Sequence, residues 1–166
     1  MATQLLINTE DLKRLSALSG NIDDDKLIQY VKIAQDTQVQ SYLGTDLLER
    51  LQAGLTASDL TAGETSLLTD YVKDMVIHWA LVVALQHTPY TISNNGVFKK
   101  FSENSETVTK EELDSLIQNH REYAVHYSQR FIDYMCYNSS DFPEYSSNTD
   151  EDIDPNTRTN FISWHL

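Results

Sequence analysis

The chain is poor in the residues that build covalent and phosphate-binding sites. Its 166 residues include one cysteine, Cys136, which excludes an intramolecular disulfide framework and a zinc site made of several cysteines. It has five glycines and no Gly-x-Ser-x-Gly, P-loop or Gly-x-Gly-x-x-Gly pattern. The sequence therefore offers no motif for a nucleophilic serine or a nucleotide.

Basic side chains are also scarce. The chain has 12 Lys and Arg against 25 Asp and Glu, for a formal net charge of −13. Proteins that grip nucleic acid need clustered Lys and Arg to neutralise phosphates. Specific DNA binding is therefore not expected, although an acidic surface can lie beside DNA and repel it.

Long hydrophobic runs are missing as well. The longest, from Met75 to Leu85, is interrupted by His78 and is too short to span a bilayer. No basic leader followed by an apolar segment opens the sequence, so export by a signal peptide is not expected. These features predict a soluble protein made in a reducing cytoplasm, without a membrane partner.

Helical periodicity is the strongest positive signal. Thr109 and Glu112 form a capping-box pattern that marks a helix start. Apolar and aromatic residues then recur every three or four positions, which predicts about seven helical turns and a rod of roughly 40 Å. The residues on this face are Leu113, Leu116, Ile117, His120, Ala124, Tyr127, Phe131, Tyr134 and Met135.

A second long helix is predicted to start at Thr61 or Thr65 and to stop at Pro89. It becomes apolar nearly all round after Met75, as expected of a helix surrounded by others, and His78 is interpreted as a packed or partly exposed helix residue. Two to three shorter helices precede it. One is predicted over residues 46–53, capped by Thr45 and closed by Gly54, and Gly44 is predicted to end the helix before it.

Residues 90–102, between the two long helices, favour a small β-hairpin. Two β-prone segments, Tyr90–Ile92 and Val97–Phe101, flank a turn that contains Asn94, Asn95 and Gly96. An irregular loop remains an alternative. Lys99 and Lys100 form a local basic pair in an acidic protein. We therefore expect the segment from Asn94 to Lys100 to contact a partner.

Residues 138–166 have a different composition, with six carboxylates against one arginine and no helical period. The segment nevertheless carries Phe142, Tyr145, Phe161 and Trp164, and such aromatics are depleted in purely disordered chains. We predict an extended acidic C-terminal interaction arm after a bundle domain of residues 1–137. The alternative is an arm that folds back onto its own bundle.

Possible metal sites fail on spacing. Asp150, Asp152 and Asp154 alternate as in a calcium loop, but Pro155 replaces the glycine of the turn and Phe161 replaces the last carboxylate. The sequence contains no His-Glu-x-x-His pattern either. No metal, cofactor or catalytic residue is predicted, and the chain is not expected to be an enzyme.

Two stretches resemble the head–tail connector proteins (adaptor or head-completion proteins) of tailed bacteriophages, particularly the ring proteins of crAss-like phages. They are "NIDDDKLIQYVKIAQDTQVQSYLGTDLLERL" and "GVFKKFSENSETVTKEELDSLIQNHREYAVHYSQRFIDYMCYNSSDFPEY". Together they lie within residues 21–145, and they match as patterns of apolar and turn residues. The resemblance does not extend to the chain after residue 146.

The resemblance implies a mainly α subunit that assembles, usually as a twelve-membered ring, beneath the portal in the virion. Such a ring joins capsid to tail, contacts the portal and further tail or ring proteins, and lines an acidic channel through which DNA passes. The predicted architecture agrees: a bundle of two long and two to three short helices, with a hairpin and an acidic arm. The rival interpretation is a non-enzymatic helical scaffolding or regulatory module that binds a protein partner through its C-terminal arm.

Overall fold

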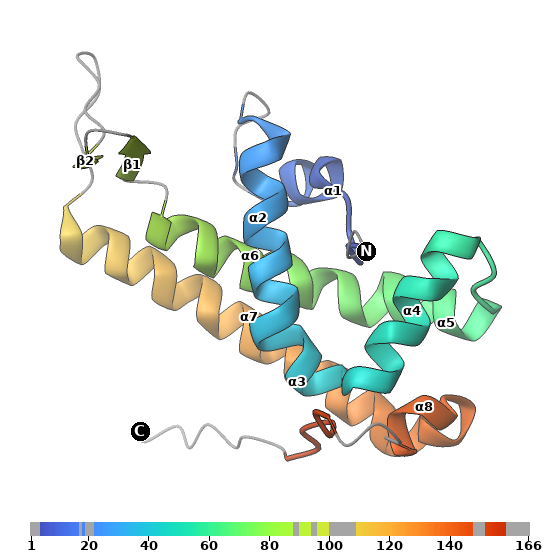
Figure 1. The fold of residues 1–166 in the computed structure, drawn as a ribbon. Coiled ribbons are helices and arrows are strands. Elements are labelled where there is room, and N and C mark those ends of the chain that lie inside the picture. Colours follow the sequence, from blue (N-terminus) through green and yellow to red (C-terminus); the bar gives the residue numbers. More distant parts are fainter. Residues whose placement is uncertain are drawn as a thin grey trace, which may run out of the picture.

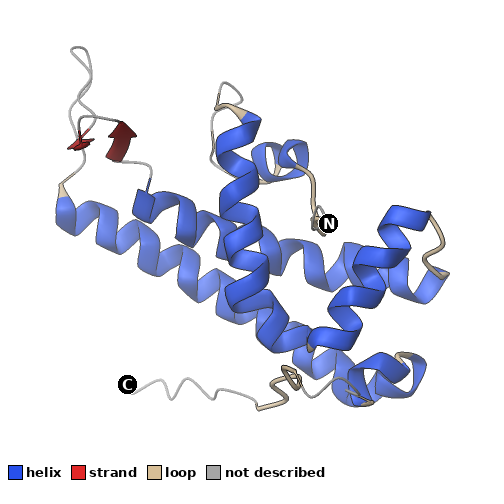
Figure 2. Cartoon of the chain, in the orientation of Figure 1, coloured by secondary structure: helices blue, strands red, loops and turns tan. Residues whose placement is uncertain are grey.

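The computed structural model is mainly helical (Figures 1 and 2). It describes residues 4–16, 18, 22–87, 90–93, 96–99, 109–147 and 152–158, with the backbone alone for the two strands. The elements are α1 (Thr9–Arg14), α2 (Asp24–Ala34), η1 (Gln35–Val39), α3 (Gln40–Leu43), α4 (Thr45–Ala57), α5 (Ala62–Leu67), η2 (Leu68–Val72), α6 (Lys73–His87), β1 (Tyr90–Ser93), β2 (Gly96–Lys99), α7 (Lys110–Asn138), η3 (Ser139–Asp141) and α8 (Pro143–Ser146). The segments η1 and η2 are π-helical turns inside longer helices, and η3 is a 3₁₀ turn.

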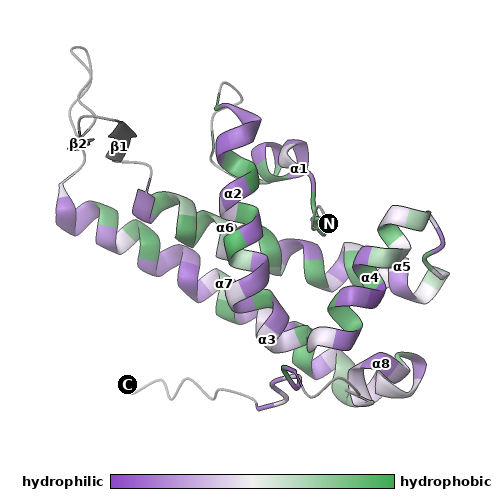
Figure 3. Cartoon of the chain, in the orientation of Figure 1, coloured by the Kyte–Doolittle hydropathy of each residue, from purple (hydrophilic) through white to green (hydrophobic). Residues whose placement is uncertain are grey.

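The core forms around α6, which packs along α7 and is crossed by α2 (Figure 1). Eight of its side chains are buried, and its hydrophobic positions run along the whole helix, whereas α7 alternates polar and apolar positions (Figure 3). A helix that is apolar all round needs neighbours on every side, so the central place predicted for the stretch after Met75 agrees with its position. The buried residues of α6 are Met75, Val76, Ile77, Trp79, Ala80, Leu81, Val82 and Ala84.

Capping boxes start both long helical segments, and the one predicted at Thr109 is confirmed. The Thr109 hydroxyl accepts a hydrogen bond from the Glu112 amide at 3.3 Å, and the Glu112 carboxylate accepts one from the Thr109 amide at 2.9 Å. Thr61 and Glu64 form the same pair, at 3.2 and 2.7 Å. The start at Thr61 is therefore correct, and the alternative start at Thr65 is wrong.

Of the two glycines around α4, Gly44 ends the preceding helix as predicted, whereas Gly54 does not end α4. Gly44 adopts φ +78° and ψ 162°, which separates α3 from α4, and Thr45 is the first residue of α4 rather than its cap. The predicted stop at Gly54 is wrong, because α4 continues to Ala57 and ends where Ser58 takes a left-handed conformation. Gly54 instead admits Leu60, since an added Cβ would lie 2.3 Å from Leu60 Cδ2.

The chain after α7 turns back onto the bundle. Phe142 and Tyr145 are 2% and 7% exposed and belong to the hydrophobic core, with the Tyr145 ring edge-on to Phe131. The prediction of an extended arm from residue 138 is therefore wrong for residues 139–146, which form η3 and α8. Burying a large aromatic side chain contributes much free energy to folding, so Phe142 and Tyr145 stabilise their own subunit rather than a contact with a partner.

Residues 152–158 lie against the corner between α3 and α4. The Thr45 amide donates to the Ile153 carbonyl at 3.0 Å, and the Asn156 amide donates to the Ser41 carbonyl at 2.8 Å. The Ile153 amide also donates to the Thr45 hydroxyl at 3.2 Å. This part of the predicted arm is thus held by its own bundle.

Two short strands lie between α6 and α7. β1 and β2 pair antiparallel, with Tyr90 opposite Lys99 and Ser93 opposite Gly96. Asn94, Asn95 and Lys100 lie outside the described residues, as does the rest of the predicted hairpin to residue 102. Because β1 follows α6 and β2 leads toward α7, the strands occur at the end of the helix pair opposite α8.

Candidate functional sites

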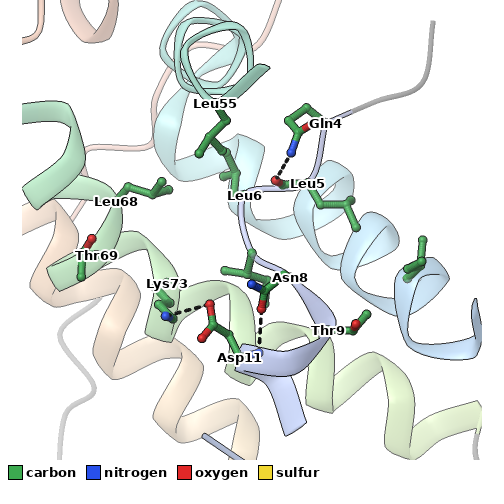
Figure 4. Close-up of a pocket in the computed structure, with 12 residues that line it drawn as sticks. Gln4, Leu5, Leu6, Asn8, Thr9, Asp11, Leu55, Leu68, Thr69 and Lys73 are labelled. Atoms are coloured by element: carbon green, nitrogen blue, oxygen red, sulfur yellow. Dashed lines mark hydrogen bonds and ion pairs between the residues drawn. The ribbon is translucent and has the colours of Figure 1, made fainter. Parts of the chain in front are cut away.

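The N-terminal segment borders an open pocket of about 650 Å³ (Figure 4). Its walls include Leu5, Ile28, Leu55 and Leu68, so the surface is largely aliphatic. Lys73 and Asp11 lie at its rim and form an ion pair at 2.8 Å. The lining residues include no histidine or cysteine, and its two charged side chains are paired with each other, so the pocket can accept apolar side chains.

Side-chain amides hold that N-terminal segment in place. Gln35, fully buried in η1, accepts a hydrogen bond from the Leu6 amide at 2.9 Å and donates to the Gln4 carbonyl at 3.3 Å. Gln52 on α4 donates to the same carbonyl at 2.9 Å. Gln35 therefore pairs with the backbone as a neighbouring strand would, while Leu6 and Ile7 enter the core.

An ionic cluster closes the corner between α4 and α5. Arg50 Nε and one terminal nitrogen contact the two Glu64 carboxylate oxygens at 2.7 and 3.0 Å, and Arg50 also reaches Asp59 at 3.1 Å. Burial works to raise the Glu64 pKa, but hydrogen bonds from Thr61 and Arg50 outweigh it and hold that pKa below its usual value. The cluster fixes the corner between α4 and α5.

Four aromatic rings meet at the seam between α6 and α7. His78 of α6 stacks on Tyr127 with ring centroids 5.2 Å apart and on His120 with centroids 5.7 Å apart, and Tyr123 lies at 5.4 Å. Burial lowers the pKa of His78, the nearby His120 lowers it further, and Asp74 opposes the shift. Burial also lowers the His120 pKa. Both shifts favour the neutral imidazole over the charged one.

No local pattern in the sequence reveals this cluster. His78 was predicted as a packed or partly exposed helix residue, and it is half-buried, but its partner comes from a helix 42 positions along the chain. His120 lies on the periodic face predicted for the helix that starts at Thr109, and His78 lies in the long helix before it. The missing information was the register between the helices, which no local pattern supplies.

The predicted interface residues are separated in the structure. Phe142 and Tyr145 are in the core, and Gly96 and Lys99 are at the two ends of β2. Asn94, Asn95, Lys100, Phe161 and Trp164 lie outside the described residues, so their predicted contacts stay predictions.

Within the described ranges, no group of three or more His, Cys, Asp and Glu side chains is placed to hold a metal ion. The same part of the chain contains no helix that is both long and apolar enough to cross a membrane. Cys136 is exposed on α7.

Comparison with known proteins gives one match. The sequence profile of a family of unknown function (DUF6712) matches residues 39–154, more than half of the chain. The chain belongs to this family. The matched region begins at the last residue of η1 and continues through the Ile153 contact with Thr45, so it contains the Gly44 corner, α6 and α7. No curated protein and no solved structure matches the chain.

Proposed function

We propose that the chain is a structural ring subunit of a phage head–tail junction, located beneath the portal and without catalytic activity. The observation that carries the proposal is the resemblance of residues 21–145 to head–tail connector proteins. In that role the subunit assembles into a closed ring, usually of twelve copies, and joins the portal to further tail or ring proteins. Head-to-tail contacts between identical copies generate such a ring when the rotation closes.

The geometry suits a component that bridges two layers. The 29 residues of α7 extend about 40 Å at 1.5 Å per residue. The strands β1 and β2 follow one end of this rod, and α8 with the C-terminal segment follows the other. Contacts at the two ends can therefore reach different neighbours across the height of one subunit.

Charge and surface composition support the same proposal. With a net charge of −13, many copies around a channel give it a negative wall, which DNA passes without binding specifically. Exposed apolar side chains on α2 and α7 are available for contacts between copies; they include Ile28, Ile33, Leu116 and Tyr123. Single exposed apolar residues are common, so assembly is argued from the resemblance first.

Locating the protein in purified virions tests this proposal. We expect mass spectrometry to find it in DNA-filled particles and gold-labelled antibody to mark the junction of head and tail. A protein present in infected cells but absent from virions would contradict a structural role. That result would favour the second candidate, a non-enzymatic helical scaffolding or regulatory module that binds a protein partner through its C-terminal arm.

The hairpin and the C-terminal end are the proposed contact regions. The Lys99–Lys100 pair suits an acidic neighbour, and Phe161 with Trp164 suits an apolar one. Changing Lys99 and Lys100 to glutamate should abolish attachment to portal-bearing capsids and leave helical content, read by circular dichroism, unchanged. Lys26→Glu with Lys32→Glu makes the same charge change on α2 and should still attach; equal attachment of both variants would remove the hairpin from the interface.

A further inference from the structure

The two histidines at the α6–α7 seam have a separation that needs explaining. His78 Nδ1 and His120 Nδ1 are 3.4 Å apart. Hydrogen bonds from N–H groups in proteins have heavy-atom distances of about 2.7–3.2 Å, so a bond between these rings is long and weak. Two imidazole nitrogens that each lie about 2.0–2.1 Å from a tetrahedral zinc ion are roughly 3.3–3.4 Å apart. The observed distance fits the edge of such a coordination shell.

The surroundings hold both rings at this separation. Tyr127 lies parallel to the His78 ring, with an interplanar angle of 7°, and Tyr123 is tilted against it. Tyr123 also packs edge-on against His120 at 6.1 Å. Side chains fixed by ring packing lose little further freedom when they bind a ligand. His78 and His120 are each only partly buried.

We propose that His78 and His120 form a two-histidine clamp for a divalent late transition-metal ion, with Zn²⁺ as the reference case, that links α6 to α7. Each neutral ring offers Nδ1 and keeps its proton on Nε2, and water completes the shell. Imidazole is a good ligand for Zn²⁺, Cu²⁺ and Ni²⁺ and a poor one for Mg²⁺ and Ca²⁺. This metal site does not depend on the proposed assembly of the subunit into a closed ring of copies.

The clamp has two protein ligands because no third His, Cys, Asp or Glu among the described residues completes a metal-holding group with them. Asp74 lies one turn before His78 on α6, and its negative charge acts on His78 from outside the shell. We therefore expect one ion per chain, bound more weakly than in a closed three- or four-ligand site, and exchangeable with chelators. The ion ties the middle of α6 to α7 without a covalent bond.

Zinc titration of the full chain without an affinity tag tests the clamp. Isothermal titration calorimetry should give one Zn²⁺ per chain, and Zn²⁺ should raise the thermal midpoint by a few degrees, a shift that EDTA reverses. Mg²⁺ at the same concentration should give no shift. Titration with Co²⁺ in place of Zn²⁺ gives a second readout. When imidazole replaces water on the ion at a tetrahedral site, Co²⁺ absorbs far more strongly in the visible range than hydrated Co²⁺ does.

Glutamine variants separate the clamp from adventitious binding. His78→Gln and His120→Gln should each lower Zn²⁺ affinity at least tenfold and remove the thermal shift. His126→Gln is the matched control, since His126 is on the same helix as His120 and also packs against Tyr127; its affinity should change less than twofold. If His78→Gln fails to fold, His120→Gln decides alone. Unchanged binding in His120→Gln, or no binding to wild type at millimolar Zn²⁺, would overturn the proposal.

Discussion

Trp79 is a large core residue whose loss should cost the bundle considerable stability. Its ring is 7% exposed in the central helix, and its Nε1–H donates to the Ser128 hydroxyl at 3.1 Å. Trp79→Ala should lower the free energy of unfolding by about 3–5 kcal/mol, since it removes a large buried ring and leaves a cavity. Urea denaturation measures the loss. Tyr137→Ala, at an 89% exposed position, is the control and should change stability by less than about 0.5 kcal/mol.

Glu64 gives a pH dependence with a definite sign. Its pKa in the folded protein is below the unfolded value, so the carboxylate contributes stability that is present above about pH 4.5 and lost as the pH falls further. Glu64→Gln should cost roughly 1–3 kcal/mol at pH 7 and flatten the loss of stability in acid. Urea melts at pH 7 and pH 3.5 measure both effects.

Glu112 provides the comparison for Glu64. It completes the same capping box at the start of α7, but the capping threonine supplies the hydrogen bonds that lower its pKa, and no arginine contributes. Glu112→Gln should therefore reduce stability less than Glu64→Gln does. Equal losses in the two variants would mean that Arg50 adds nothing to the α4–α5 corner.

Among elements, the N-terminal segment depends on one buried amide. Gln35→Leu removes the acceptor for the Leu6 amide and should destabilise the protein by about 1–3 kcal/mol, because a buried N–H is left without a partner. Hydrogen exchange should then be fast at Leu6 and unchanged in α7. Gln52→Leu loses a contact to Gln4 that Gln35 also makes, so the Leu6 amide should stay protected; loss of protection there would place the holding role on α4.

Gly44 should not tolerate a side chain. Its φ of +78° with ψ 162° is a conformation that essentially only glycine adopts, at a cost of about 1–3 kcal/mol for other residues. An added Cβ would also lie 2.8 Å from Pro155 Cδ. Gly44→Ala should lower stability in urea and speed amide exchange at Ile153 and Asn156. Gly63→Ala, with its nearest neighbours at 4.0 Å, should be neutral or stabilising, and equal stability of the two variants would contradict this account.

Local signals in the sequence predicted the elements better than their contacts. The capping box at Thr109 and the all-apolar stretch after Met75 are each decided within one or two turns, and the structure agrees with both. The predicted helix end at Gly54 was wrong because glycine commonly ends helices, whereas this glycine makes room for Leu60. A short-range pattern cannot show that a distant side chain needs the space.

The same limit explains why the contacts of the candidate site residues could not be predicted from the sequence. Phe142 and Tyr145 were predicted as interface anchors because they follow the end of helical periodicity, yet a single turn at η3 returns them to the core. The His78–His120 pair depends on how α6 and α7 slide past each other, which is settled by packing across 42 positions. Helical periodicity did predict a mainly α chain, which the structure confirms, and the net charge of −13 predicts the acidic surface that the ring proposal uses.

At the scale of the whole molecule, the 29 residues of α7 separate the end that carries β1 and β2 from the end that carries α8 by about 40 Å, and the proposed role of the subunit is to assemble into a ring. The most direct test is the native mass of the full-length protein, alone and mixed with the portal protein of the same phage, across a wide concentration range. We expect a closed ring, usually of twelve subunits, that forms alone or on the portal and is seen as a ring by electron microscopy. A protein that stays monomeric or dimeric under both conditions would contradict the proposed function.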